Sequence, residues 1–596
     1  MLLERIYAAQ PETSRGLPCK LSTDPTKSLI IYTNGLSIFL RNVDNPLKCQ
    51  IYSKHTGHVQ VAKCCPQGRT LIASADNKGN VHTWEYLSEE NNCQQINELH
   101  PPLITINDIV WSVDTQRIAI GGRGRERFGH VFTSDTGNSV GEIMGITRDV
   151  IAIDYRPCKP FRVVLGSDDG TVSFFNGPPF KFSKKIEVFP KAIHCMSYSP
   201  DGQHLAVGSA NGGIALLNGD YGEMLFEFGK HNRSVMGVSW SPDGQNLVSV
   251  GTDGVVNIWS IAKYQNPIRS YNFNDGVENY VDYQQLGCIW LNDRIVSVSM
   301  LGHLNIFSAD NLRIMKSIQG HQSSISALAC FNNMIISGGQ DGIITIRTDT
   351  TESTMRAHRN NIVCIAVANK WMLSCGIDDT LVFFNPHQAK IITSVSLDDQ
   401  PVGCATFDSG IALVVCRNSI IKFEGTVQIA KYRIGDVILS VSISHDATEL
   451  VIATNNHKVL IYLISDLEKP MRILKFEDNV NKMAHSPNGQ YIAMAYDESN
   501  KVVCFRRSDY ETIDNDYWNF HAAKVTSLSW CPSSQYLAST SIDSHVMIYD
   551  TKNIRITQQN RNAHDRSPVM ASSWPVQDIL YTGGHDSCVR KWRVTL

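Results

Sequence analysis

The sequence predicts an all-β fold, made of two seven-bladed β-propellers in tandem. Three observations predict it: apolar residues alternate with period two in short runs, Asp-Gly and Asn-Gly turns separate these runs, and the pattern recurs along the 596 residues. The repeat measures roughly 43 residues and occurs about fourteen times, and this length is typical of a four-stranded propeller blade. Because single rings carry roughly four to eight blades, fourteen units indicate two rings of seven.

The clearest unit spans residues 231–260 and has three alternating runs, separated by Ser-Pro-Asp-Gly and Gly-Thr-Asp-Gly turns. His231 begins the unit, Asp253 lies in its second turn, and Trp259 follows that aspartate by six residues. This arrangement is typical of a WD40 repeat.

Other units repeat this histidine and aspartate, with a hydroxyl residue four positions before the aspartate. One Ser-His-Asp trio would suggest nucleophilic catalysis, but five at equivalent positions indicate a buried hydrogen-bond chain that stabilises each blade. The residues predicted for this structural network are His231, Ser249, Asp253, Trp259, His321, Asp341, His358, Asp378, His521, Asp543, His564, Asp586 and Trp592.

Residues 20–318 divide into seven successive units, and residues 319–596 into seven more. In the first ring, strands are expected at 20–22, 29–33 and 37–41 in the first unit, and at 287–291, 295–298, 304–308 and 313–318 in the seventh. The last blade of the second ring has strands at 569–573, 579–583 and 589–594, and no fourth.

The N-terminal residues 2–10 have the alternation of a spare strand. We predict that they supply the missing outer strand of the last blade, because an unpaired sheet edge invites aggregation. The alternative is a disordered N-terminal tail.

Composition excludes several functional classes. A net charge of −3 gives no basic surplus for nucleic acid, and no apolar run is long enough to span a membrane. The sixteen cysteines are irregularly spaced and form no Cys-x-x-Cys pair, so we expect no metal and no other cofactor. They favour reduced thiols in a cytoplasmic protein over a disulfide-bonded secreted one, and we expect the protein to be a monomer. Fourteen blades leave no residues for a catalytic domain, so we expect no enzyme.

A charged loop replaces the usual tight turn at residues 121–129. A glycine-rich phosphate loop would be followed by a helix, whereas a strand follows here, so a nucleotide site is the weaker interpretation. An elaborated loop on a rigid ring favours a partner contact instead, with Arg125, Glu126 and Phe128 as candidate residues.

Two further positions carry residues that the structure of a blade does not require. Asp168 precedes the aspartate that matches Asp253 in register, so it is either a partner contact or a solvated carboxylate. Lys181 and Phe182 follow a Gly-Pro-Pro-Phe connection, in which Phe180 or Phe182 is exposed, and we favour Phe182 as the exposed partner contact.

These segments resemble the actin-interacting protein 1 family. The resemblance covers the whole chain and rests most specifically on Tyr32–Gly35, Leu40–Asn42, Asp44–Pro46, Gly124–Gly129, Gly166–Asp169, Gly177–Phe182, Leu286–Cys288 with Trp290, and Ser297–Ser299. It implies a non-enzymatic, cytoskeleton-associated protein that binds actin filaments decorated by actin-depolymerising factor/cofilin and promotes their disassembly by severing or capping.

Within that family, activity is expected at Glu126, Asp168, Lys181 and Phe182, on an exposed face of the first propeller. The family tends to carry an aromatic residue where this chain has Ala192. The competing interpretation is a generic WD-repeat scaffold, for example in ubiquitin ligation or RNA processing, which would be indifferent to changes at Glu126 and Phe182.

Overall fold

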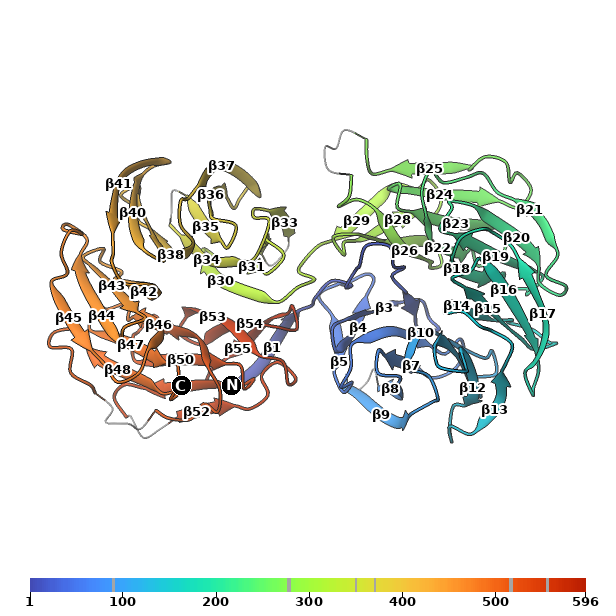
Figure 1. Ribbon diagram of the computed structural model, residues 1–596, viewed down its shortest axis with the longest axis horizontal. Coiled ribbons are helices and arrows are strands. Elements are labelled where there is room, and N and C mark those ends of the chain that lie inside the picture. The colour runs from blue at the N-terminus through green and yellow to red at the C-terminus, as the bar shows by residue number, and fades with distance from the viewer. Residues whose placement is uncertain are drawn as a thin grey trace. The chain divides into compact units, whose positions relative to one another are not determined.

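The computed structural model describes residues 1–87, 92–275, 280–348, 351–368, 371–513, 518–553 and 557–595. The chain divides into two compact units, one of Gln10–Ile318 and one of Met1–Ala9 with Gln319–Leu596. In the described ranges we count fourteen antiparallel sheets, seven in each unit, arranged around the centre of that unit (Figure 1). The predicted all-β fold of tandem seven-bladed propellers is therefore confirmed.

The unit Gln10–Ile318 contains seven four-stranded sheets, each ordered as its strands follow in the chain. Its first four blades are β2 (Ser22–Thr23), β3 (Leu29–Asn34), β4 (Ser37–Asn42), β5 (Cys49–Tyr52); β6 (Val59–Cys64), β7 (Leu71–Asp76), β8 (Val81–Leu87), β9 (Asn92–Leu99); β10 (Thr105–Trp111), β11 (Arg117–Arg123), β12 (Gly129–Thr133), β13 (Ser139–Ile143); β14 (Val150–Tyr155), β15 (Arg162–Ser167), β16 (Thr171–Asn176), β17 (Lys181–Glu187). The other three are β18 (Ile193–Tyr198), β19 (His204–Ser209), β20 (Ile214–Asn218), β21 (Met224–Glu227); β22 (Val235–Trp240), β23 (Asn246–Gly251), β24 (Val255–Ser260), β25 (Arg269–Asn272); β26 (Gln285–Trp290), β27 (Arg294–Ser299), β28 (Leu304–Ser308), β29 (Ile314–Ile318).

The second unit follows the same plan. Its first four blades are β30 (Ile325–Phe331), β31 (Met334–Gly339), β32 (Ile343–Arg347), β33 (Glu352–Arg356); β34 (Ile362–Val367), β35 (Met372–Gly376), β36 (Thr380–Asn385), β37 (Lys390–Ser396); β38 (Pro401–Thr406), β39 (Ile411–Cys416), β40 (Ser419–Glu424), β41 (Val427–Arg433); β42 (Ile438–Ile443), β43 (Glu449–Thr454), β44 (Lys458–Leu463), β45 (Arg472–Lys475). The remaining strands are β46 (Val480–His485), β47 (Tyr491–Tyr496), β48 (Val502–Arg506), a three-stranded sheet within the described residues; β49 (Val525–Trp530), β50 (Tyr536–Ser541), β51 (Val546–Asp550), β52 (Thr557–Asn560); β53 (Val569–Val576), β54 (Ile579–Gly584), β55 (Val589–Arg593).

The last sheet takes its outer strand from the N-terminus. Strand β1 (Leu2–Tyr7) pairs antiparallel with β55, with Leu2 opposite Arg593 and Tyr7 opposite Val589. The Glu4 carboxylate lies 3.1 Å from Lys591 Nζ and 2.6 Å from Arg593 Nη2, so ion pairs add to the backbone ladder. Figure 1 accordingly shows the N and C labels next to each other.

The ring of the first unit begins earlier than residue 20. The Glu12 amide donates to the Thr33 carbonyl over 3.0 Å, and the Cys19 amide donates to the Leu286 carbonyl over 2.7 Å. Residues 10–19 therefore join the first blade to the seventh, and the ion pair between Arg294 and Asp44, at 2.6 Å, links the same two blades.

The predicted histidine chains lie inside the blades. His231 Nε2 lies 2.8 Å from Ser249 Oγ, its Nδ1 lies 3.0 Å from Asp253, and Trp259 Nε1 donates to the same hydroxyl over 2.7 Å. Polar groups between buried strands are thus satisfied in sequence from indole to carboxylate. The same histidine–hydroxyl contact, at 2.7–2.8 Å, occurs in His358 with Ser374, His521 with Ser539, and His564 with Thr582, and each of these histidines also contacts its predicted aspartate.

The prediction for His321 is wrong in one contact. His321 Nε2 lies 2.8 Å from Ser337 Oγ, but Nδ1 makes no hydrogen bond within the described part of the chain, and Asp341 accepts from the Ile343 amide instead. Asp341 is held instead by Ser323, whose Oγ accepts from the Asp341 amide over 3.2 Å, and by the Ile343 amide. In the same blade Arg347 occupies the position of the aromatic residue and donates to Ser337 over 3.2 Å. Burial, together with this cation, lowers the pKa of His321 to about 3, so its ring stays neutral.

One complete network was missed from the sequence. His55 Nε2 lies 2.7 Å from Ser74 Oγ, Trp84 Nε1 donates to the same hydroxyl over 3.1 Å, and His55 Nδ1 lies 3.4 Å from Asp76. The separation of 21 residues between His55 and Asp76 was a usable indication. The six-residue spacing from aspartate to aromatic residue does not reveal this network, because Asp76 lies at the end of β7 and Trp84 follows it at a longer distance along the chain.

Neither disulfide bonds nor metal-binding groups of side chains are found in the described ranges. All sixteen cysteines are free thiols. Within those same ranges, no three His, Cys, Asp or Glu side chains are grouped so as to hold a metal ion, and no helix is long and apolar enough to cross a membrane.

Candidate partner-binding site

The charged loop connects β11 to β12 in the third blade. Arg125 and Glu126 are exposed at its tip, while Phe128 is half-buried and packs against the core shared with the next blade. Phe128 was predicted as a partner contact, but most of its ring packs against this core. At Gly124 a Cβ atom would lie 1.9 Å from the Arg127 carbonyl oxygen, so the loop can approach itself this closely only with glycine at this position.

Asp168 lies in the hairpin between β15 and β16 of the fourth blade, with its side chain exposed. Its neighbour Asp169 accepts from Thr171 Oγ1 over 2.6 Å and pairs with Lys185 at 3.0 Å, which is the structural role expected of the second aspartate. Gly170 completes the turn with φ of +82°, and a Cβ there would lie 1.9 Å from the Phe189 carbonyl oxygen. The tight turn therefore fixes where the Asp168 carboxylate emerges.

A charged cluster joins these two blades around Asp168. The Asp168 amide donates to the Asp149 carbonyl over 3.0 Å, and the Asp149 carboxylate pairs with Arg123 Nε at 2.8 Å. Partial burial, Asp149 and Asp169 raise the pKa of Asp168 above its ordinary value, although Arg148 and Arg123 act in the opposite direction. The Asp168 carboxylate therefore gains most when a partner brings an additional positive charge.

Lys181 and Phe182 begin β17, the outer strand of the fourth blade, and both are exposed. Phe180 is 2% exposed and packs edge-to-face on Tyr155, whereas Phe182 is 50% exposed and makes an edge contact with Phe175. The main chain around Phe180 is crowded, since a Cβ at Gly141 would lie 2.7 Å from its amide nitrogen. Phe182 is therefore the ring left available to a partner.

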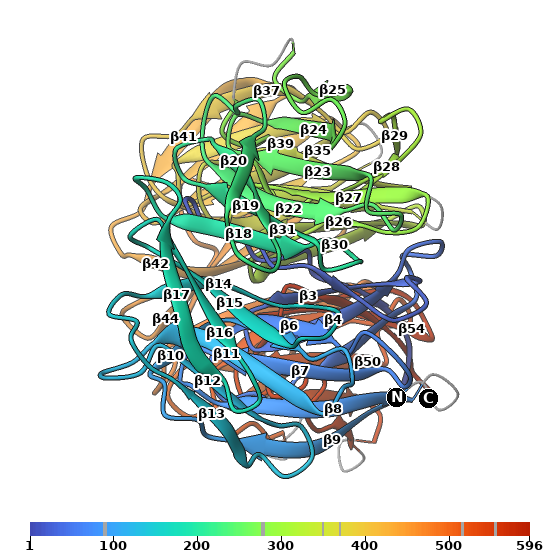
Figure 2. The ribbon, with the colours of Figure 1, turned by 90° about the vertical axis from the view of Figure 1, so that its right-hand side faces the viewer.

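The predicted residues do not form one cluster. Thr171, next to the Asp168 hairpin, pairs with Glu187 at one end of the β16–β17 ladder, while Asn176 pairs with Lys181 at the other end. Asp168 and Phe182 are thus at opposite ends of the same sheet. Figure 2 shows β17 running obliquely along the rim, where it contacts β13 of the third blade.

The segment 144–149 connects the two groups. A Cβ at Gly145 would lie 3.8 Å from the Phe182 ring, and Asp149 at the other end of the segment accepts from the Asp168 amide. Met144, at the start of this segment, is 54% exposed. Spacing and residue type do not single out Met144, Arg148 or Asp149, because their importance comes from contacts between neighbouring blades.

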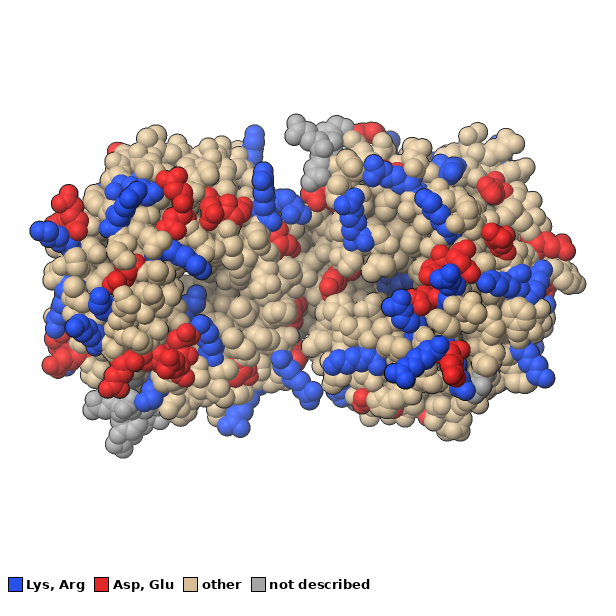
Figure 3. Space-filling view, viewed as in Figure 1, with Lys and Arg blue, Asp and Glu red and all other residues tan. Residues whose placement is uncertain are grey.

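The arrangement suits recognition of a protein. It offers exposed charges of both signs and a half-exposed aromatic ring, and each of the five Ser-His-Asp type trios lies in a blade with its histidine buried. Figure 3 shows basic and acidic side chains interspersed on the face in view. Ala192 precedes β18 and is half-buried, with its carbonyl accepting from the Ala210 amide.

Comparisons with known proteins follow the same repeat pattern. The family model described as WD domain, G-beta repeat matches residues 183–216, 222–260, 312–346 and 517–550. The chain is 32% identical to actin-interacting protein 1 of Drosophila melanogaster, over 99% of this chain and 98% of that protein. It is also 32% identical to WD repeat-containing protein 1-B of Xenopus laevis and 31% identical to WD repeat-containing protein 1 of Mus musculus, in both cases over 100% of this chain and 99% of the relative.

Proposed function

Because this chain belongs to the actin-interacting protein 1 family, we propose that it binds actin filaments decorated by actin-depolymerising factor/cofilin and promotes their disassembly. The protein acts without catalysis, as a cytoplasmic, cytoskeleton-associated monomer. The observation that carries the proposal is similarity along essentially the full length to a relative named for its interaction with actin.

The contact surface in this proposal lies on the third and fourth blades. It includes the β11–β12 loop, the β15–β16 hairpin and the start of the outer strand β17. Glu126, Asp168 and Lys181 present charges that their own blades do not need for folding, and Phe182 supplies an apolar anchor. The segment 144–149 adds Met144 between them. A rigid ring holds these side chains in fixed positions, which lowers the entropy lost on binding.

The proposed mechanism is a population shift. If this surface fits the cofilin-altered filament better than bare actin, binding stabilises the altered state by that difference in affinity and favours severed or capped filaments. A ligand with equal affinity for both filament states would shift nothing, so the effect must depend on cofilin.

The test is co-sedimentation and filament disassembly with purified actin, with and without cofilin. We expect disassembly above the cofilin-only rate for the parent chain and a loss of that gain in Asp168→Lys. The matched control is Glu223→Lys, a charge reversal at another exposed carboxylate, on the fifth blade, which should keep full activity. Equal disassembly without cofilin contradicts the mechanism, and an unchanged Asp168→Lys contradicts the site.

A generic WD-repeat scaffold is the competing proposal. It predicts that the parent chain does not sediment with actin, whether cofilin is present or not. The same sedimentation experiment therefore separates the two functions before any variant is made.

A further inference from the structure

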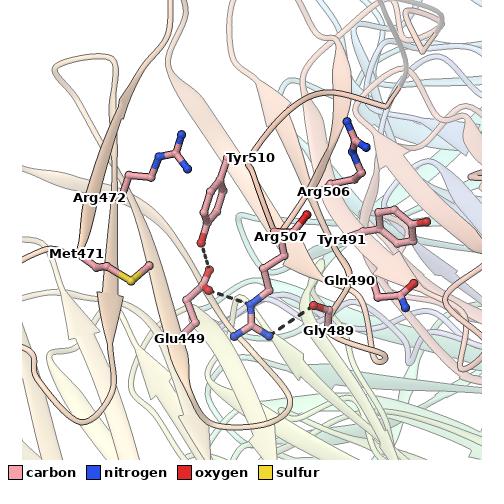
Figure 4. A pocket seen from close by; sticks show the side chains of 10 residues that line it. Glu449, Met471, Arg472, Gly489, Gln490, Tyr491, Arg506, Arg507 and Tyr510 are labelled. Carbon is pink, nitrogen blue, oxygen red and sulfur yellow. Dashed lines mark hydrogen bonds and ion pairs between the residues drawn. The ribbon is translucent and has the colours of Figure 1, made fainter.

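An open cavity of about 800 Å³ lies on the second unit, between the fourth and fifth of its blades. Its walls come from the starts of β43 and β45, the hairpin between β46 and β47, and the end of β48 with the residues after it (Figure 4). All of these segments lie at the same end of their two sheets, so the cavity is a notch between neighbouring blades rather than part of the central channel. Its volume lies within the usual range of ligand sites.

The floor of this cavity is a preformed ionic network. Glu449 is 4% exposed, and its carboxylate accepts from Arg507 Nε over 2.8 Å and from the Tyr510 hydroxyl over 2.9 Å. Burial raises the pKa of Glu449, but contacts with His485, Arg507 and Tyr510 outweigh burial and hold that pKa below its ordinary value. Arg507 Nη1 also lies 3.0 Å from the Asp446 carboxylate, so Glu449 and Asp446 together balance Arg507 and the floor adds no positive charge for a ligand.

Two other guanidinium groups give the cavity its positive charge. Arg472 lies over the Tyr510 ring, with 5.1 Å from Cζ to the ring centroid, and it makes no ion pair with any carboxylate in the described ranges. Arg506 has two weak, exposed pairs, with Asp509 at 3.6 Å and Glu511 at 3.4 Å. Such exposed pairs contribute little and are readily exchanged for a ligand's carboxylate.

An apolar strip separates these two arginines. Figure 4 shows Arg472 and Arg506 on either side of Tyr510, with Met471 beside Arg472 and Tyr491 beside Arg506. Met471 is 54% exposed although it directly precedes strand β45. An exposed methionine and partly buried tyrosines next to arginine form a combination that is enriched at protein interfaces.

We propose that this notch, formed by Met471, Arg472, Tyr491, Arg506 and Tyr510, binds an acidic peptide segment of a protein partner. The segment presents two carboxylates flanking an apolar side chain, so that each carboxylate meets one arginine and the apolar group lies over Tyr510 and Met471. The separated guanidinium groups fit two charges better than one phosphate, which is usually held by donors converging on one point. This site lies on the other unit from the proposed cofilin–actin surface and does not depend on it.

The test is a fluorescence-anisotropy titration of the full-length chain with a fluorescein-labelled, amidated peptide of sequence Gly-Glu-Phe-Glu-Gly. We expect saturable binding that weakens about tenfold or more when both glutamates are replaced by glutamine, since charge-assisted hydrogen bonds are lost. Arg472→Ala should weaken binding about tenfold, and Arg506→Ala about threefold because its pairs with Asp509 and Glu511 already compete. Lys475→Ala, an exposed cation on the same strand outside the notch, should change nothing.

Arg472 and Arg506 are both exposed, so their variants should melt at the temperature of the parent chain. Equal binding of the glutamine peptide, or no effect of Arg472→Ala, would overturn the proposal. Displacement of the peptide by an excess of inorganic phosphate at constant ionic strength would also overturn it, because the notch would then be a phosphate site.

Discussion

The backbone amide of Asp168 donates to the carbonyl of Asp149 over 3.0 Å, which ties a hairpin of the fourth blade to the segment leaving the third. The position of the Asp168 carboxylate is thus set by two blades together, through Arg123 as well as Asp149. A partner that contacts Asp168 meets a rigid inter-blade surface and not an isolated turn.

Phe182 and Phe180 should separate binding from stability. Phe182→Ala removes a half-exposed ring, so we expect normal melting and a loss of cofilin-dependent disassembly of roughly ten- to thirtyfold, as for an interface hot spot. Phe180→Ala empties a buried site and should cost about 3–5 kcal/mol of unfolding free energy. Denaturant unfolding and filament assays on both variants check this. A stable but fully active Phe182→Ala would remove that ring from the contact surface.

Ala192 offers a gain-of-function test. If the family's aromatic residue at this position adds to the partner surface, Ala192→Phe should speed cofilin-dependent disassembly by several-fold, about the value of one additional aromatic contact. Ala192→Leu is the matched control for added bulk without an aromatic ring. No change in either variant, in the presence of saturating cofilin, would mean that this position lies outside the contact.

Glu4 should stabilise the second unit through β1. Glu4→Lys replaces its two ion pairs with repulsion from Lys591 and Arg593 and should weaken the pairing of β1 with β55. We expect faster hydrogen exchange at the β55 amides and a lower melting temperature. Deletion of residues 1–9 should have the larger effect and promote aggregation, because it exposes the edge of β55. Unchanged exchange in both variants would show that β1 adds nothing.

His55 predicts how stability depends on pH. Burial, with His82 nearby, lowers the pKa of His55 from 6.5 to about 4, although Asp76 acts in the opposite direction. The unfolded chain takes up this proton at the ordinary pKa, so the contribution is fully present above pH 6.5 and is lost as the pH falls toward 4. Its size is about 3 kcal/mol, since one pKa unit corresponds to about 1.4 kcal/mol.

His55→Gln is the variant that isolates this contribution. It should be less stable than the parent chain near neutral pH, and the difference in unfolding free energy should narrow by about 2–3 kcal/mol near pH 4. His387→Gln, at an exposed position, should follow the parent at every pH. A constant difference between His55→Gln and the parent would contradict the assignment of His55 as a buried neutral ring.

The fold was predictable because its information is local. Period-two runs and Asp-Gly turns specify strands and hairpins one blade at a time, as at Asp169 and Gly170. The differences from the prediction lie in two blades whose internal pattern changes. Asp76 is shifted along β7, so the spacing does not reveal the His55 network, and in the blade of His321 an arginine, Arg347, replaces the aromatic residue and His321 lacks its aspartate contact.

The candidate site was predictable only in part. The unusual residues themselves, Asp168 and Phe182 among them, stand out in the sequence because a blade does not require them. Their placement at opposite ends of one sheet follows from the two successive hairpins on either side of β16, but the approach of Gly145 to Phe182 depends on how the outer strands of neighbouring blades tilt against each other. Sheet twist and contacts between blades determine that tilt, and neither can be obtained from spacing along the chain.

The origin of β1 affects the order in which the protein matures. Along the chain, Leu2–Tyr7 are synthesised long before their partner strand β55. The unit Gln10–Ile318 can assemble on the nascent chain, whereas the other unit is complete only after β55 has been made. Until β55 has been made, Leu2–Tyr7 have no strand to pair with. Chaperones that bind extended apolar peptides therefore have their best opportunity to capture this segment during that time.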